Sequence, residues 1–195
     1  MPVQLPLEGF EPPPPLTDGL FFAVLPDAAT AERIAALAHR LRGELGLRGK
    51  PLAATRLHAT LHHLGNHAGL PPGLAELACR AGDAVVAAPF EAGFDHAESF
   101  LGRPRNRPFV LRGGDEALAP LGALQRQLGA AMRRAGLGHW VTPHFTPHVT
   151  LLYDGRFVTH QAVAPVQWTV REFVLVHSLL GRSTHLHLAR WPLAG

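Results

Sequence analysis

The chain contains one four-residue pattern, His-x-Thr-Leu, twice, and each copy lies in a run of alternating polar and apolar residues. The copies occupy residues 58–61 and 148–151. Alternation with a period of two is typical of a β-strand, and residues two positions apart in a strand point to the same face. A face that carries imidazoles and hydroxyls fits a wet cleft better than a core. The pattern therefore favours a fold in which two polar-faced strands meet across a shared cleft.

The second copy gives the more detailed expectation. We expect residues 144–154 to form one strand with a polar and an apolar face. The polar face would carry His144, Thr146, His148, Thr150 and Leu152, and the apolar face Phe145, Val149, Leu151 and Tyr153. The first copy is expected in a shorter strand over residues 55–64.

The elements that precede the two copies also repeat. An apolar run over residues 20–25 and a helical pattern over 34–45 precede the first copy, and an apolar run over 109–111 and a helical pattern over 118–132 precede the second. The interval is 37 residues from Phe21 to His58 and 39 from Phe109 to His148. This repetition predicts two similar α+β lobes that are related by a pseudo-two-fold axis, with a groove between them.

The remaining patterns predict one more helix and three more strands. Apolar spacing indicates the helix over residues 74–86, before Pro89. Strands are expected over residues 90–100, 168–180 and 185–193, the last two joined by a turn at Gly181 and Arg182.

Composition is that of a globular domain. The chain has 195 residues, of which 47% are hydrophobic and 17% charged. We expect a single domain over residues 19–195, made of the two lobes, and a Pro-rich arm over residues 1–18 that contains a run of four prolines. The net charge of +3 is too small for a general nucleic-acid coat but allows a local basic cleft.

Two further sequence features bear on the compartment. The sequence has no stretch of about 18 apolar residues, so we expect no membrane span. Cys79 is the single cysteine and cannot form an internal disulfide, which indicates a reducing compartment and predicts a cytoplasmic protein. We interpret Cys79 as a small buried hydrophobic residue.

Two facing His-x-Thr strands would have a definite chemistry. Imidazole is the side chain that acts as acid or base near neutral pH, and a Thr hydroxyl can donate to an anionic oxygen without adding charge. Such a pair suits in-line displacement at phosphorus: one neutral His takes a proton from water, one protonated His gives a proton to the leaving oxygen, and the hydroxyls hold the non-bridging oxygens. This scheme needs no metal and no cofactor.

The paired motifs resemble those of the 2H phosphoesterase superfamily. The surrounding sequence, residues 56–65 and 146–151 together with 173–178 and 188–193, is similar to the 2′-5′ RNA ligase branch, whose members act as RNA 2′,3′-cyclic phosphodiesterases. The resemblance covers about residues 19–193. It implies a bilobal α+β fold with two antiparallel β-sheets flanking a central groove and helices on the outside.

The resemblance also implies an activity and roles for the site residues. The activity is hydrolysis of a 2′,3′-cyclic phosphate RNA end to a 2′-phosphate, with 2′-5′ ligation of RNA in some members. By analogy His58 is the proton donor to the leaving 3′-oxygen and His148 the proton acceptor that activates water, although the motifs themselves leave this order open. Thr60 and Thr150 bind the phosphate. The implied partner is an RNA end, with no protein partner, so we expect a monomer.

One position departs from the family pattern. Where many relatives begin the last strand with Tyr, this chain has His185, so its substrate specificity is open. His185 and His187 also have the same-face spacing of metal ligands, but without a nearby carboxylate or Cys we interpret them as a polar strand face.

Other candidates come from charge and aromatic character. Arg56 and Arg156 flank the motifs and are candidates for phosphate charge, and Tyr153 is a candidate for stacking on a base. Phe22 is interpreted as core. Three arginines of a basic loop could also meet an RNA backbone: Arg103, Arg105 and Arg107. We interpret His62 as a surface residue near a loop and leave the role of His144 open.

Several functions remain open at this point. The same fold could serve another cyclic nucleotide, ADP-ribose 1″,2″-cyclic phosphate or a 2′-5′ oligonucleotide. A non-catalytic RNA-end binding protein is a second class, disfavoured because a binder needs no acid–base pair. A metal-dependent hydrolase is a third, disfavoured because the motifs pair His with Thr rather than with carboxylates.

Overall fold

Two four-stranded antiparallel sheets and three α-helices make up the part of the chain that the computed structural model describes, residues 13–194. Residues 1–12 of the predicted Pro-rich arm lie outside the described residues. The strands are β1 (Asp18–Val24), β2 (Ala59–His67), β3 (Phe90–Ser99), β4 (Arg107–Arg112), β5 (Val149–Asp154), β6 (Gln161–Val170), β7 (Glu172–Leu179) and β8 (Thr184–Pro192). The helices are α1 (Ala28–Glu44), α2 (Leu74–Asp83) and α3 (Asp115–Arg134), with 3₁₀ turns η1 (Ala54–Arg56) and η2 (Gly138–Trp140).

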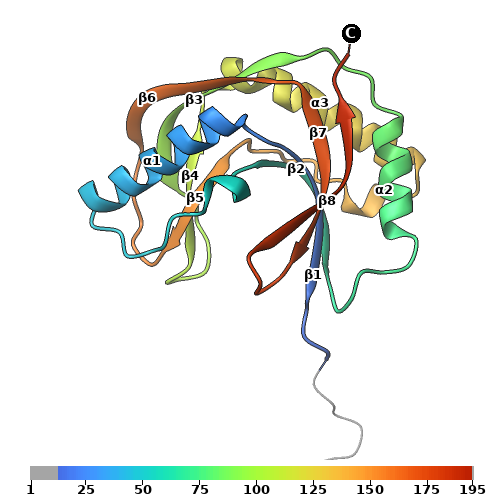
Figure 1. Ribbon diagram of the computed structural model, residues 1–195, viewed down its shortest axis with the longest axis horizontal. Coiled ribbons are helices and arrows are strands. Elements are labelled where there is room, and N and C mark those ends of the chain that lie inside the picture. Colours follow the sequence, from blue (N-terminus) through green and yellow to red (C-terminus); the bar gives the residue numbers. More distant parts are fainter. Residues whose placement is uncertain (1–12, 195) are drawn as a thin grey trace, which may run out of the picture.

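The two sheets have equivalent strand orders, β2-β1-β7-β8 and β5-β4-β3-β6. The unit β1-α1-β2 in one lobe corresponds to β4-α3-β5 in the other. Each motif precedes or enters an edge strand, β2 or β5, and these two edge strands contact each other (Figure 1). The α+β fold with duplicated lobes and two antiparallel sheets, predicted from the sequence, is therefore confirmed.

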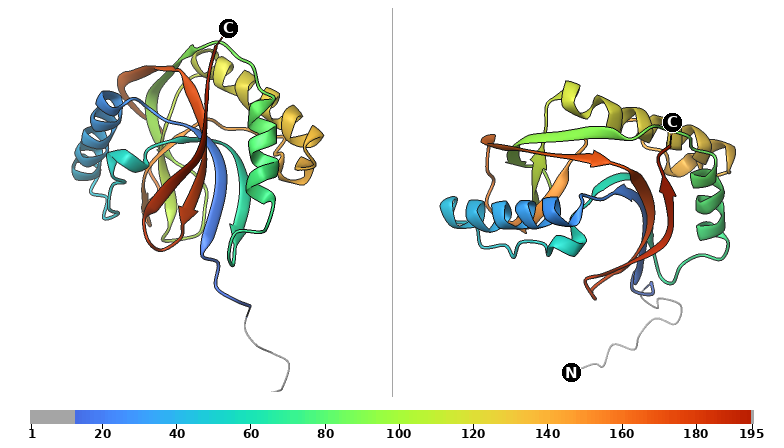
Figure 2. Two further views of the ribbon diagram at one scale, coloured as in Figure 1. Left: turned by 45° about the vertical axis from the view of Figure 1, so that its right-hand side comes forward. Right: turned by 45° about the horizontal axis from the view of Figure 1, so that its top comes forward.

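The helices cover the outside of the two sheets (Figures 1 and 2). Helix α1 packs beside β5 and β6, whereas α3 packs on β3 and also contacts α2. Asp27 caps the N-terminus of α1, and its side chain accepts a hydrogen bond from the backbone N–H of Thr30. No helix among the described residues is long and apolar enough to cross a membrane.

Buried residues of both sheets form one continuous hydrophobic cluster. Phe22, Phe94, Phe109 and Phe173 are among its largest fully buried side chains. The interpretation of Phe22 as core is thereby confirmed. Because the lobes share this core, they hold the two edge strands in a fixed relation, and that relation positions the motifs.

Each motif contains a β-bulge at its Leu. In the first lobe Thr60 pairs with Ala23 and His62 with Phe22, so Leu61 is an extra residue. In the second lobe Thr150 pairs with Val110 and Leu152 with Phe109, so Leu151 is the extra residue. A bulge shifts the alternation of the residues that follow it. The duplication thus extends to a backbone irregularity.

The bulges overturn two expectations from simple alternation. Leu152 was expected on the polar face and Tyr153 on the apolar face, but Leu152 is fully buried and Tyr153 is 47% exposed. His62, interpreted as a surface residue, is 1% exposed and its Nε2 lies 2.9 Å from the carbonyl oxygen of Gln125. In both lobes the residue after the extra Leu points to the core.

The predicted limits of both motif strands were also wrong. Strand β5 begins at Val149 rather than at residue 144, and β2 begins at Ala59 after the 3₁₀ turn η1 rather than at residue 55. Pro147 lacks a backbone N–H and cannot donate a ladder hydrogen bond, which accounts for the late start of β5. Both catalytic candidates among the histidines therefore lie just before their strands.

Three further limits differ from the prediction. The strand expected over residues 168–180 is two strands, β6 and β7, and Trp168 belongs to β6. Most of β6 was missed because Pro165 reads as a break, yet β6 is an edge strand, where a missing N–H is tolerated. Helix α2 ends at Asp83, and Val86, assigned to its apolar stripe, is 72% exposed.

Candidate active site

The two motif histidines are held by equivalent hydrogen bonds. The Nδ1 of His58 lies 2.7 Å from the carbonyl oxygen of Arg56, and the Nδ1 of His148 lies 2.7 Å from that of Thr146. A carbonyl only accepts, so in both rings the Nδ1–H donates and the Nε2 remains for another partner. The carbonyl comes from two residues earlier in both lobes. The turn before each strand therefore fixes the tautomer and the ring orientation.

Aromatic rings pack against both imidazoles. The ring of His58 stacks on Phe21 at 4.8 Å between centroids and meets the edge of His185 at 5.4 Å. The ring of His148 packs edge-to-face against Phe100 at 4.9 Å. These contacts restrict rotation of each imidazole and exclude water from one of its sides.

Burial dominates the electrostatics of the pair. It lowers the pKa of His58 to about 4, and the hydrogen bond to the Arg56 carbonyl offsets only part of this shift. The charges of His148, Arg56 and His187 lower the pKa of His58 further. Burial also lowers the pKa of His148, and the charge of Arg112 adds to that effect. The charge of His148 thus acts on His58 from the other lobe.

In each lobe, the motif Thr lies on the same sheet face as a residue that acts on the motif His, which is Phe21 in the first lobe and Arg112 in the second. Thr60 pairs with Ala23, two residues from the Phe21 ring that stacks on His58. Thr150 pairs with Val110, two residues from Arg112, whose charge acts on His148. Both threonines are partly exposed. In each lobe the motif hydroxyl therefore lies on the same sheet face as a residue that acts on the imidazole of that lobe.

His185 and Arg56 belong to the surroundings of the His58 imidazole. Burial lowers the pKa of His185 to about 4, and the charges of His58, Arg56 and His187 lower it further. The pairing of β7 with β8 sets His185 opposite Ser178 and His187 opposite Val176. Within residues 13–194 the Nε of Arg56 is buried without a protein hydrogen-bond partner. His185 thus packs against the His58 ring, and the charge of Arg56 acts on both imidazoles.

Arg112 and Phe100 act on the second imidazole and were not predicted from the sequence. The guanidinium of Arg112 lies 5.8 Å from the ring centroid of Phe100, and its Nη1 donates to Glu98 Oε1 at 2.6 Å. Alternation could have indicated Arg112, because it follows Val110 by two positions in a strand and therefore lies on the same face. Val110 pairs with the motif residue Thr150. Phe100 lies just beyond the end of β3, where no sequence pattern connects it with His148.

The other predicted residues are spread over several places. His144 is exposed, and Cys79 is partly buried, with its pKa raised chiefly by burial. In the basic loop, Arg103 is exposed and Arg107 Nη1 donates to the carbonyl of Gly155 at 2.7 Å. Arg105 does not approach the imidazoles but lines a hollow near the end of β5.

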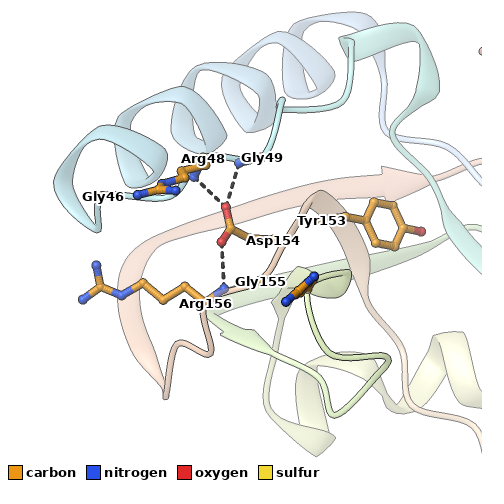
Figure 3. Close-up of a pocket in the computed structure, with 8 residues that line it drawn as sticks. Gly46, Arg48, Gly49, Tyr153, Asp154, Gly155 and Arg156 are labelled. Atoms are coloured by element: carbon orange, nitrogen blue, oxygen red, sulfur yellow. Dashed lines mark hydrogen bonds between the residues drawn. The ribbon is translucent and has the colours of Figure 1, made fainter.

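This hollow has a volume of about 630 Å³. Its lining consists of Gly46, Arg48, Gly49, Arg105, Tyr153, Asp154, Gly155 and Arg156 (Figure 3). Neither His58 nor His148 lines it. Its lining thus contains three arginines and no histidine.

One cluster within residues 13–194 has the composition of a metal site. Single ligand atoms of His96, Glu98 and His160 lie within 4.8 Å of one another. The carboxylate of Glu98 is already paired with the Arg112 guanidinium at 2.6 Å. The Arg112 guanidinium already compensates the charge of this carboxylate, so the donor set fits an ion pair better than a metal centre. His185 and His187 do not belong to this cluster.

Comparisons with known proteins agree with the geometry. A family model described as the 2′-5′ RNA ligase superfamily matches residues 25–182. Among solved structures, E. coli LigT complexed with ATP is 27% identical with a TM-score of 0.69, and the match covers 92% of this chain and 99% of LigT. E. coli LigT complexed with 3′-AMP is likewise 27% identical, with a TM-score of 0.68 and the same coverage.

A more distant structure shows the same fold. The protein TT0787 of Thermus thermophilus is 23% identical with a TM-score of 0.68, and the match covers 90% of this chain and 97% of that one. Among curated protein sequences, none matches the chain significantly.

Proposed function

The chain belongs to the 2′-5′ RNA ligase superfamily of 2H phosphoesterases, and from this premise we propose that it hydrolyses 2′,3′-cyclic phosphate ends of RNA to 2′-phosphates without a metal. One observation carries the proposal: two imidazoles make equivalent hydrogen bonds, and each presents its Nε2 because its Nδ1–H is bound to a carbonyl. A non-catalytic binder would not require both imidazoles to be in the same tautomer.

The proposed step is a single in-line displacement. The Nε2 of His148 takes a proton from water, the resulting hydroxide attacks phosphorus, and the bond from phosphorus to the 3′-oxygen breaks. His58 gives its proton to that oxygen, which leaves as the 3′-hydroxyl, and the phosphate stays on the 2′-oxygen. Thr60 and Thr150 donate hydrogen bonds to the non-bridging oxygens, where charge must be stabilised. The assignment of donor and acceptor follows the resemblance to the family.

The electrostatics add a condition to this scheme. With a pKa of about 4, His58 is neutral at pH 7 in the free protein and cannot yet donate a proton. An anionic phosphate beside the imidazole favours its charged form and raises its pKa. We therefore propose that His58 takes up its proton when the substrate binds.

The same groups would support 2′-5′ ligation. A 5′-hydroxyl of a second RNA would replace water at His148, and the 3′-oxygen would leave as before. The LigT structures with ATP and 3′-AMP support a nucleotide as the ligand class. Another cyclic nucleotide or a 2′-5′ oligonucleotide is the alternative substrate of the same site.

A product assay tests this proposal. An RNA that ends in a 2′,3′-cyclic phosphate is incubated with the protein in the presence of a chelator, and the end group is identified by NMR or chromatography. We expect a 2′-phosphate and full activity with the chelator. A 3′-phosphate product would contradict the mechanism. Loss of activity on chelation that one metal restores would instead indicate a metal-dependent hydrolase. Binding of the RNA without turnover would indicate an RNA-end binding protein.

A further inference from the structure

We propose that the arginine-lined hollow at the end of β5 is a second phosphate subsite, which binds a phosphodiester of the RNA strand on the 5′ side of the cyclic end. This inference rests on the proposed function and extends it from a terminal nucleotide to a strand. An RNA that ends in a 2′,3′-cyclic phosphate has its other phosphates only on the 5′ side. A second phosphate subsite must therefore take one of those.

Three separate segments of the chain contribute an arginine to the lining of the hollow. Arg48 follows α1, Arg105 lies in the β3–β4 loop and Arg156 follows β5. All three are exposed, and none belongs to an ion pair within the described part of the chain. Arginine is suited to phosphate because its donors match the oxygen geometry.

The one acidic residue of the hollow is engaged by the backbone. Asp154 Oδ2 accepts from the backbone N–H groups of Arg48 at 2.6 Å and Gly49 at 2.7 Å, and its Oδ1 accepts from that of Arg156 at 2.8 Å (Figure 3). Burial acts to raise the pKa of Asp154, but the amide hydrogen bonds outweigh it and hold the pKa below its ordinary value. The lining thus holds three arginines and one carboxylate, so the hollow keeps an excess of positive charge.

The segment after α1 packs closely against β5 at the hollow. A Cβ at Gly49 would lie 2.0 Å from the carbonyl oxygen of Tyr153, so only glycine lets the segment after α1 lie this close to β5. The Nη1 of Arg156 donates to the carbonyl of Leu45 at 2.7 Å, at the end of α1. Arg105 has a φ of 72°, a conformation that favours glycine, so its side chain is presented at a cost in backbone strain.

Strand β5 runs from the second motif to the hollow. Because of the bulge at Leu151, Thr150 and Tyr153 lie on the same face of β5. The β4 partners of Thr150 and Asp154 are Val110 and Arg107, three positions apart, which at about 3.3 Å per residue places Asp154 ~10 Å beyond Thr150. A phosphate in the hollow is thus distinct from the one at the histidines, and the exposed ring of Tyr153 lies between them, where it can stack on a base.

A substrate-length series tests the subsite. The substrates are a nucleoside 2′,3′-cyclic phosphate and oligonucleotides of two to six residues with the same cyclic end. For the wild-type protein we expect kcat/KM to rise at least about tenfold at the length that first reaches the hollow. The double variant Arg48→Gln/Arg105→Gln should lose that rise and keep the mononucleotide rate. For the long substrate, the plot of log kcat/KM against log salt concentration should be less steep in this variant than in wild type, with a slope smaller in magnitude by about 1 to 2.

Matched variants separate the alternatives. Arg80→Gln removes an exposed arginine from α2, on the side of the molecule away from the hollow, and should behave as wild type (Figure 1). Arg156→Gln should also lose the length effect, with its melting temperature recorded because Arg156 supports the end of α1. Equal length dependence in wild type and in the Arg48/Arg105 variant would overturn the subsite. A wild-type protein that cleaves neither the mononucleotide nor the oligonucleotides would overturn the proposed function, whereas one that cleaves both without a length effect would overturn the subsite alone.

Discussion

At the scale of single residues, the site depends on the tautomer and the pKa of two imidazoles. Each donates its Nδ1–H to a carbonyl two residues earlier, and each has a pKa lowered chiefly by burial. Both rings are therefore neutral near pH 7 in the free protein. Proton donation requires one of them to become charged, and the substrate phosphate is the group that can cause this.

The pH dependence of hydrolysis follows from these shifts. The rate constant kcat/KM reports the free enzyme, in which one imidazole must be protonated and the other neutral. Both pKa values lie below 6.5, so we expect a bell-shaped profile with its optimum below pH 6.5, whichever imidazole donates. The optimum of kcat should lie at higher pH, because bound phosphate raises both pKa values. A flat kcat/KM between pH 5 and 8, or an optimum above pH 7, would contradict this account.

Tyr153 should act on RNA binding and not on the chemical step. Its ring is exposed on the same face as Thr150, and stacking of a base on an aromatic ring contributes about 1–3 kcal/mol by alanine substitution. We expect Tyr153→Ala to raise KM for an oligonucleotide at least about fivefold with little change in kcat, and Tyr153→Phe to remain near wild type. Steady-state kinetics of both variants check this. A fall in kcat alone would assign Tyr153 to the reaction instead.

The site residues differed in how well the sequence revealed them. The paired pattern singled out His58, Thr60, His148 and Thr150, because two matched copies are informative where one is not. The environment of each imidazole was not predictable. Phe100 lies far from His148 in the sequence, and only the pairing of β3 with β4 and of β4 with β5 brings it near.

At the scale of secondary structure, the bulges decide which side chains reach the site. Alternation through the second motif assigned Tyr153 to the core and Leu152 to the polar face, and the extra residue Leu151 reverses both. A bulge has no reliable signature in a single sequence, since its cause lies in pairing with the neighbouring strand. Local alternation predicted where the strands of the two motifs lie, but it did not predict their register or their first and last residues.

The segment that follows α1 depends on Asp154. This segment runs along the free edge of β5, where the backbone N–H of Leu52 also donates to the carbonyl of Leu151 at 2.8 Å. We expect Asp154→Ala to lower the free energy of unfolding by about 3 kcal/mol, since hydrogen bonds to charged groups contribute about 1.5–3 kcal/mol each and the three share one carboxylate. Urea unfolding of this variant checks the value. A change below about 0.5 kcal/mol, or one matched by Asp115→Ala at the exposed start of α3, would contradict it.

At the scale of the whole molecule, a shared core joins two copies of one strand–helix–strand unit. The duplication was visible in the sequence as a repeated interval, and it correctly predicted two lobes. The sequence predicted that the two motif strands meet, but it did not show that β2 and β5 are both edge strands. That arrangement brings side chains from opposite lobes into one environment, and it also leaves several imidazoles poorly solvated.

Stability should therefore fall in mild acid. Burial is the main reason that six histidines have a lowered pKa: His58, His62, His63, His148, His185 and His187. Below pH 6.5 the unfolded chain binds more protons at these residues than the native protein does, so the free energy of unfolding decreases as pH falls from 7 to 5. Urea unfolding at both pH values measures this. Equal or greater stability at pH 5 would show that the imidazoles are not poorly solvated.

The central claim is that His58 and His148 act as one acid–base pair across the two lobes. Its most direct test is the single-turnover rate on an RNA with a 2′,3′-cyclic phosphate end for His58→Ala, His148→Ala and the double variant, with His39→Ala on the exposed face of α1 as control. We expect each single variant to lose at least about 10²-fold in rate, the double variant to lose much less than the product of the two, and the control to match wild type. Turnover near the wild-type rate in either single variant would contradict the claim.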